Sequence, residues 1–200
     1  RIVGFYHTDF PNAYIKAAAA LAFGEPAASS VASIFSRYAC LLYSRCDITL
    51  APSFVLAHRL QRYGIRNAMH MPLGVDIDMF HPSKRNPALR ASLGIDANEL
   101  MIVYAGRIDT EKRVNIPVEA MRLLPGGFPA KLVLAGEGPL KKTLAREPDD
   151  RIIFMPYISG RGELAEFLAS GDIYITAGPH ETFGLSVLEA QASGLPVVGV

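Results

Sequence analysis

The sequence predicts an α/β fold built on parallel β-sheets, and three features of the chain indicate it. Short, continuous apolar runs, typical of buried parallel strands, alternate with segments of helical periodicity. Gly and Pro separate these segments. Polar residues suited to ligand binding follow several of the runs, and open parallel sheets bind ligands at the carboxyl ends of their strands. The pattern is regular over 100–200 and weaker over 1–71, which predicts two doubly wound domains.

The composition argues against several other classes of protein. The 200 residues are 50% hydrophobic and carry a formal charge of +1, without the dense basic stripe of a nucleic-acid binder. The two cysteines, Cys40 and Cys46, lack the spacing of zinc ligands and indicate a reducing compartment. The longest apolar run, 17–23, falls well short of the ~20 residues that span a membrane. Because the sequence opens and stops inside strand-like runs, we expect an internal fragment of a longer protein.

The first half begins with a predicted strand at 1–6, which ends in a polar cluster at 7–11. His7 in that cluster is either structural or a general base, an oxyanion stabiliser or a substrate hydrogen-bonder. Residues 12–46 are mostly helical in pattern, with Ser29 or Ser30 as the N-cap of a helix that ends near residue 45. The remaining elements are a strand within 47–53, a helix at about 54–63 capped by Ser53, and a strand at 67–71.

The helix expected near 30–45 carries an apolar stripe at helical spacing. We expect the stripe to pack in the core or on the sheet, and a groove for a lipid acceptor is the alternative. The stripe consists of Ile34, Tyr38, Leu41 and Leu42.

The second half alternates strands and helices more regularly. A short helix at about 87–93 is ended by Gly94, and the second domain begins after it. The strands are expected at 100–105, 131–135, 151–155, 172–176 and 197–198, and the helices at about 115–124, 139–146, 163–169 and 185–192.

A strand, loop, helix and strand make up the stretch 172–199, around which the second half is organised. The loop meets the helix N-terminus, where unpaired N–H groups and the helix dipole favour an anion, and Gly184 permits close approach of a ligand. Glu181 and Glu189 bracket this anion site about 12 Å apart at helical rise. That separation is too long for a pair of glycosidase carboxylates, which lie about 5–9.5 Å apart. It suits a long ligand with a central diphosphate, such as a nucleotide sugar.

Glu189 also has a purely structural interpretation. Ser186 and Glu189 spell S-x-x-E, a capping box in which the glutamate only marks the start of a helix. The four residues alone leave both interpretations open.

The segment 106–112 leaves the predicted strand 100–105 with a glycine and two cations. Arg107 offers a planar fork and Lys112 a point charge, so the two can converge on a diphosphate. A solvated basic loop is the alternative. The turn GEGP at 136–139 is not G-x-G-x-x-G, so the dinucleotide fingerprint is absent there.

Several of these strings resemble the retaining GT-B glycosyltransferases, in particular glycosyltransferase family 4. E-x7-E followed by AQASGLPVV resembles the donor-site signature, and GR-x4-K after a strand resembles the phosphate-binding motif. YHTDFP resembles the acceptor-side loop of members that glycosylate lipids, among them mannosyl, glucosyl and sulfoquinovosyl transferases. The resemblance implies two Rossmann-like domains, both incomplete here: the acceptor side at 1–75, a linker with a short helix at 76–98, and the donor side at 99–200.

The resemblance also implies roles for individual residues. Glu181 would lie at the transferred sugar, Glu189 would bind the nucleotide ribose, and His7 would stand beside the reacting centre. Arg107 and Lys112 would bind the diphosphate and stabilise its departure. The backbone amides facing the sugar and diphosphate would be those of Phe183, Gly184 and Leu185.

Asp76 and Asp78 spell D-x-D, with which another class of glycosyltransferase holds a divalent metal. The flanks PLGVD and MFHP resemble instead the connection between the two GT-B domains, and GT-B enzymes generally need no metal. We therefore expect a solvated turn here, no metal site and no cofactor.

The resulting hypothesis is a retaining transfer of a hexosyl group from a UDP- or GDP-linked sugar to a lipid, polyol or glycan hydroxyl. The fragment alone would be inactive. The alternative is a GT-B module that binds a nucleotide sugar without transferring it. We expect no nucleic-acid partner and a cytoplasmic location, with peripheral contact at the inner face of the membrane as a further option.

Overall fold

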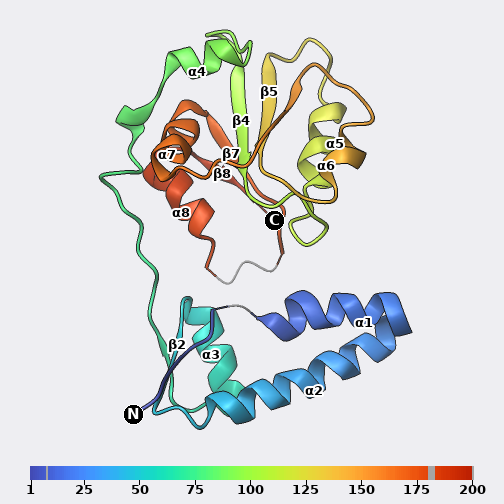
Figure 1. The fold of residues 1–200 in the computed structure, drawn as a ribbon, viewed down its shortest axis with the longest axis vertical. Helices are drawn as coiled ribbons and strands as arrows, with labels where there is room; N and C mark the ends of the chain where they lie inside the picture. Colours follow the sequence, from blue (N-terminus) through green and yellow to red (C-terminus); the bar gives the residue numbers. More distant parts are fainter. Residues whose placement is uncertain (8, 180–182, 200) are drawn as a thin grey trace. The chain divides into compact units, whose positions relative to one another are not determined.

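The computed structural model describes residues 1–7, 9–179 and 183–199, and these separate into two compact units (Figure 1). The first unit comprises 1–74 together with Phe183, and the second comprises 75–179 and 184–199. Each unit has its own parallel sheet. No described helix combines the length and the apolarity needed to cross a bilayer.

The first unit is a three-stranded parallel sheet in the order β1-β2-β3. Ser53 caps the helix after β2, as predicted, because its side chain accepts a hydrogen bond from the Leu56 N–H at 3.2 Å. The core lies between the sheet and this helix, around Leu56, Leu60 and Ile65. The elements are β1 (Val3–Phe5), a π-helical turn (Pro11–Ile15), α1 (Lys16–Phe23), α2 (Glu25–Tyr43), β2 (Ile48–Ala51), α3 (Phe54–Arg62) and β3 (Ala68–His70).

The start predicted for α2 is wrong. The helix begins at Glu25, and the preceding Gly24 separates it from α1 with φ +81°, a conformation that glycine adopts without strain. Pro26 fits in the first turn, where a missing N–H costs nothing. Ser29 and Ser30 therefore lie inside the helix rather than at its cap.

The predicted core position of the α2 apolar stripe is also wrong, because the stripe faces solvent. Ala39, Cys40 and Tyr43, near the carboxyl end of α2, pack against the core of this unit, and Ala28 and Ala32 are buried nearer its start. Periodicity reveals that a stripe exists, but the neighbours of the helix decide which face is covered. The exposed members are Ile34 (66%), Tyr38 (59%), Leu41 (55%) and Leu42 (47%).

The second unit is a five-stranded parallel sheet in the order β6-β5-β4-β7-β8. The chain runs outward from β4 through β5 to β6, then returns to the other side of β4 to form β7 and β8. The strand predictions are confirmed to within a residue or two at each end. The strands are β4 (Leu100–Ala105), β5 (Ala130–Ala135), β6 (Ile152–Met155), β7 (Ile173–Ile175) and β8 (Val197–Val198).

Helices cover both faces of this sheet, which makes it doubly wound as predicted (Figure 1). One core cluster includes α7, α8 and the segment around Phe80, and the other includes α5 and the residues beside α6. The helix predicted at 139–146 is much shorter than expected. The helices are a 3₁₀ turn (Pro82–Lys84), α4 (Pro87–Ser92), α5 (Asn115–Leu123), α6 (Lys141–Leu144), α7 (Arg161–Ser170) and α8 (Leu185–Ala192).

Arg90 of α4 ties the segment before β4 to the second sheet. Its buried guanidinium donates to the Asp172 carboxylate at 2.8 Å, to the Ser170 carbonyl at 3.0 Å and to the Glu99 carbonyl at 2.6 Å. Asp172 also accepts from Arg85 at 2.8 Å and from the Met101 N–H at 2.7 Å. This network fixes the start of β4 against the start of β7.

Candidate functional site

The topology of the second sheet indicates where a ligand binds. The chain leaves β4 in one direction and β7 in the other, so the strand order reverses between these two neighbours. Open α/β sheets bind ligands in the crevice at such a switch point, beyond the carboxyl ends of the strands. The segment at 106–114 leaves β4 there, and α8 begins in the connection that follows β7.

Hydrogen bonds brace the segment after β4. The Tyr104 hydroxyl donates to the Arg107 carbonyl at 2.7 Å. The Gly106 N–H donates to the Ala135 carbonyl at 3.0 Å, and the Ile108 N–H donates to the Glu137 carbonyl at 2.9 Å. The pairing of β4 with β5 thus continues past both strands and holds the backbone of Arg107.

Close backbone contact explains the glycines of GEGP. A Cβ atom added to Gly136 would lie 1.9 Å from the Gly106 carbonyl oxygen, and one added to Gly138 would lie 2.2 Å from the Ile108 carbonyl oxygen. No side chain fits at these distances. The glycines therefore allow the two loops to pack together and so position Arg107.

Carboxylates surround the cations of this loop. The Arg107 guanidinium pairs with Asp109 at 2.6 Å and with Glu111, and its side chain is about half exposed at 53%. The Lys112 N–H donates to the Asp109 carboxylate at 2.9 Å, so Asp109 closes the loop in the way that an N-cap residue binds the N–H three residues on. A diphosphate that binds Arg107 would have to replace these carboxylates as the partner of its guanidinium.

The N-terminus of α8 has the form expected of an anion site. Gly184 precedes the helix with φ +81° and ψ +55°, in the left-handed region that favours glycine. No side chain caps the first turn, so the first N–H groups have no side-chain acceptor among the described residues. At the other end, Gly194 and Leu195 donate to the carbonyls of Gln191 and Ala190, a Schellman ending that satisfies the last turn.

The capping-box interpretation of Glu189 is wrong. Helix α8 starts at Leu185, so Ser186 is its second residue and Glu189 lies a full turn beyond the start. The carboxylate is half-buried and has Arg161 at 3.7 Å. Burial raises the pKa of Glu189, and the Arg161 charge opposes this only in part. A carboxylate so placed would gain from hydroxyl donors on a ligand.

Arg161 itself is held in place by an aromatic ring. Its guanidinium carbon lies 5.2 Å from the centre of the Phe80 ring, within cation–π range. Phe80 is fully buried, so the ring is a fixed platform. The cation beside Glu189 is therefore positioned by the segment that precedes β4.

The predicted site residues divide between the two units. Arg107, Lys112, Gly184, Leu185 and Glu189 all belong to the second unit, in the elements that border the switch point. Leu185 is 40% exposed at the start of α8. Phe183 groups with the first unit. The remaining acidic prediction, at position 181, lies outside the described residues.

His7 lies in the first unit, two residues past the end of β1. It is exposed, and its ring lies 5.6 Å from the ring of Phe5. Asp9 pairs with Arg59 of α3 at 3.1 Å, which ties the loop after β1 to that helix. The loop is thus positioned at the carboxyl end of its strand, as predicted, and the role of His7 stays a prediction.

The D-x-D stretch forms a turn. The Asp76 carboxylate accepts from the N–H groups of Asp78 at 3.1 Å and Met79 at 3.0 Å. Over the described ranges, the structure contains no cluster of three or more side chains suited to hold a metal ion.

Sequence reasoning missed three residues that shape the site. Tyr104 orients the Arg107 backbone, Asp109 closes the loop, and Arg161 accompanies Glu189. A signal existed for Asp109, since aspartate is a preferred N-cap residue, whose carboxylate accepts from the N–H three residues on. No local pattern pointed to Arg161, because its partner lies 28 residues further along the chain.

Solved structures with the same fold define the class of protein. A sucrose-phosphate synthase from Thermosynechococcus elongatus matches 98% of this chain and 49% of its own, with a TM-score of 0.76 and 23% identity. The Anabaena protein HepE, solved with UDP-glucose, matches 98% of this chain and 52% of its own, with a TM-score of 0.74 and 19% identity. The chain has the fold of the GT-B glycosyltransferases.

Sequence comparison identifies the family within the GT-B glycosyltransferases. The family described as Glycosyl transferases group 1 matches residues 85–200, and the chain belongs to this family. A GDP-mannose-dependent phosphatidylinositol dimannoside mannosyltransferase from Mycobacterium tuberculosis is 40% identical over 76% of this chain and 40% of its own length. A sulfoquinovosyl transferase from Arabidopsis thaliana is 34% identical over 78% of this chain and 31% of its own. The chain thus spans less than half the length of these relatives.

Proposed function

We propose that the protein transfers a hexosyl group from a nucleoside diphosphate sugar to a lipid, polyol or glycan hydroxyl, with retention of anomeric configuration, as in glycosyltransferase family 4. The observation that carries the proposal is the meeting of a cationic loop and an uncapped helix N-terminus at the switch point of the second sheet. Both features attract a diphosphate.

The donor would lie across this switch point. Arg107, Lys112 and the N-terminus of α8 would bind the diphosphate, and Glu189 would accept hydrogen bonds from the ribose. The backbone at Gly184 and Leu185, with Phe183, would face the diphosphate and the sugar. Glu181 would orient the sugar to be transferred.

The reaction would exchange one bond at the anomeric carbon for another on the same face. The bond from that carbon to the diphosphate oxygen breaks, and a bond to the acceptor oxygen forms. The acceptor proton passes to the departing phosphate, so no protein nucleophile is required. Charge that grows on the leaving group would be stabilised by Arg107 and Lys112, and His7 would contribute on the acceptor side.

The relatives suggest the substrates. Two of the named relatives transfer mannose or sulfoquinovose, and the name of the M. tuberculosis enzyme specifies GDP-mannose and a phosphatidylinositol acceptor. We infer a GDP- or UDP-linked hexose as donor, no metal or cofactor, and a cytoplasmic enzyme that meets its acceptor at the inner face of the membrane. The 200 residues alone would lack activity.

The test must distinguish a glycosyltransferase from a module that binds a nucleotide sugar without transferring it. The full-length protein would be incubated with GDP-mannose, UDP-glucose or UDP-sulfoquinovose and a membrane lipid extract, and both nucleoside diphosphate release and labelled glycolipid would be measured. Glycolipid that appears in step with nucleotide release supports the transferase. Nucleotide-sugar binding with neither product would support the binding-only module instead.

A further inference from the structure

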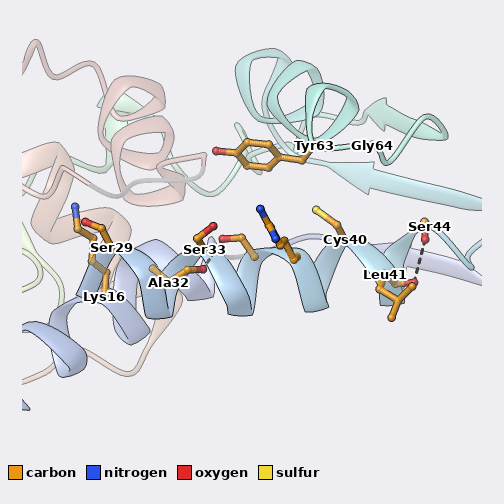
Figure 2. A pocket seen from close by; sticks show the side chains of 11 residues that line it. Lys16, Ser29, Ala32, Ser33, Cys40, Leu41, Ser44, Tyr63 and Gly64 are labelled. Atoms are coloured by element: carbon orange, nitrogen blue, oxygen red, sulfur yellow. Dashed lines mark hydrogen bonds between the residues drawn. The ribbon is translucent and has the colours of Figure 1, made fainter. Parts of the chain in front are cut away.

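A cavity of about 630 Å³ lies within the first unit, between one face of α2 and the end of α3 (Figure 2). Its lining on α2 recurs every three or four residues, so it follows a single helical face. Tyr63 and Gly64 form the opposite wall. This face is defined by Ser29, Ser33, Arg37 and Cys40 of α2 and by Ser44, which follows the helix as its C-cap.

The charged side chains that line the cavity are all positive. Lys16 and Arg37 both line it, and no lining residue is acidic. Lys16 is half-buried and Arg37 is exposed, and across the described part of the chain neither forms an ion pair. Other buried or half-buried cations, among them Arg90, Lys141 and Arg151, pair with carboxylates. Two cations that share a cavity without a carboxylate favour an anionic ligand.

Hydroxyl groups complete the lining. The Ser44 hydroxyl donates to the Leu41 carbonyl at 3.0 Å, and the Ser36 hydroxyl donates to the Ala32 carbonyl at 2.9 Å, so their oxygens remain acceptors. Ser29 and Ser33 form no side-chain hydrogen bonds within the described ranges. Figure 2 shows Ser33 and Tyr63 on facing walls of the cavity. Acceptors and donors beside two cations suit a ligand that carries both phosphate and hydroxyl groups.

The cavity shares no residue with the acceptor-side loop at 6–11. Ser44 precedes the start of β2 and Gly64 precedes the start of β3, so this part of the cavity lies toward the amino ends of the strands. His7 follows the carboxyl end of β1, and all three strands are parallel. This end of the cavity and His7 therefore lie toward opposite edges of the same sheet.

We propose that this cavity is a second binding site, for a phosphorylated polyol such as a glycerol phosphate or inositol phosphate. The polyol is either the head group of an anionic lipid or a free metabolite of the same chemistry. Lys16 and Arg37 bind the phosphate, and the serine hydroxyls of α2 bind the polyol. None of its lining residues is assigned to the transfer reaction, so it anchors a ligand and does not transform it.

The test compares probes that separate the two sources. The full-length protein would be titrated with sn-glycerol 3-phosphate, and in parallel with vesicles of phosphatidylglycerol or of phosphatidylcholine. The double variant Lys16→Met/Arg37→Met removes both cations, and Ser33→Phe fills the cavity while leaving both charges. Arg45→Met, which removes an exposed cation outside the cavity, is the matched control.

We expect at least tenfold weaker binding of one anionic probe in the double variant and in Ser33→Phe, with Arg45→Met within twofold of wild type. Loss of glycerol phosphate binding identifies a soluble ligand, and loss confined to phosphatidylglycerol vesicles identifies a lipid. Thermal unfolding shows whether the first unit of each variant is folded. Nucleoside diphosphate affinity reports the second unit, so it tests the transferase proposal independently. If all variants bind both anionic probes as wild type does, or if Arg45→Met weakens binding equally, the site does not exist.

Discussion

Replacement of Arg90 by methionine tests how the donor unit is held together. The side chain is only 8% exposed, and it connects α4 to the starts of β4 and β7 through Glu99, Ser170 and Asp172. Methionine keeps much of the volume and removes every hydrogen bond. The variant therefore isolates the polar network from the packing around it.

The loss of stability depends on how well the Asp172 carboxylate remains paired after Arg90 is replaced. Removal of one partner from a buried ion pair costs about 3–5 kcal/mol. Asp172 keeps its bonds to Arg85 and to the Met101 N–H, and its side chain is 22% exposed, so its charge remains partly compensated. We expect the lower end, about 3 kcal/mol, which lowers the melting temperature of this unit by roughly 10 °C.

The same network makes a prediction about pH. Burial alone would raise the pKa of Asp172, but the hydrogen bonds from Met101, Arg85 and Arg90 outweigh it and lower that pKa. A carboxyl with a lowered folded pKa stabilises the fold above its unfolded value, near 3.8, and this contribution disappears as pH falls through the folded pKa. Arg90→Met should therefore shift the onset of acid unfolding to higher pH.

Urea and thermal unfolding of the wild type, Arg90→Met and the control Arg146→Met would measure these effects. Arg146 is exposed and its side chain has no bond partner in the described structure, so its replacement should change stability by less than about 0.5 kcal/mol. Equal stability of the two variants, or an unchanged acid transition in Arg90→Met, would refute the structural role assigned to Arg90.

Two further predictions concern the donor site. Gly136→Ala should destabilise the protein by at least about 2 kcal/mol and weaken nucleotide binding, because the added Cβ would collide with the Gly106 carbonyl. The control is Gly126→Ala, whose added Cβ meets no atom within 4 Å. The control should change neither the free energy of unfolding nor the nucleotide affinity. Equal effects would show that the loop contact does not position Arg107. Glu189→Gln should weaken nucleoside diphosphate binding roughly tenfold without a loss of helix stability, because no capping box is broken. Burial raises the pKa of Glu189 above its usual value of 4.5, so the wild type should lose nucleotide affinity as pH falls through this raised pKa and the carboxylate is protonated. The affinity of Glu189→Gln should not change over the same pH range. If the affinities of the two proteins change with pH in parallel, Glu189 does not contact the ribose.

The strands of the second unit were predictable because each is a continuous apolar run bounded by glycine or polar residues. The runs at 100–105 and 131–135 become β4 and β5, paired residue for residue. Buried parallel strands need apolar side chains on both faces, so their sequence signal is local and strong. The ligand loops after them were predictable for the same reason, since each begins where an apolar run stops.

Other features depended on partners far away in the sequence. The burial of Arg90 is set by Asp172, 82 residues away, and no pattern around α4 signals it. The stripe of α2 was visible, but its exposure depends on which elements pack beside the helix. The S-x-x-E pattern at Ser186 was misleading because Gly184 starts the helix two residues earlier than a capping box requires.

The most direct test of the donor site is calorimetric titration of the full-length protein with GDP, UDP and ADP without metal, for the wild type and for Arg107→Ala. We expect one nucleotide to bind tightly and its binding to weaken by about 1.5–3 kcal/mol in the variant, the range of a hydrogen bond to a charged group. Arg146→Ala should bind as the wild type does. Unchanged affinity in Arg107→Ala, or no binding of any of the three nucleotides by the wild type, would contradict the assignment of the switch point as a diphosphate site.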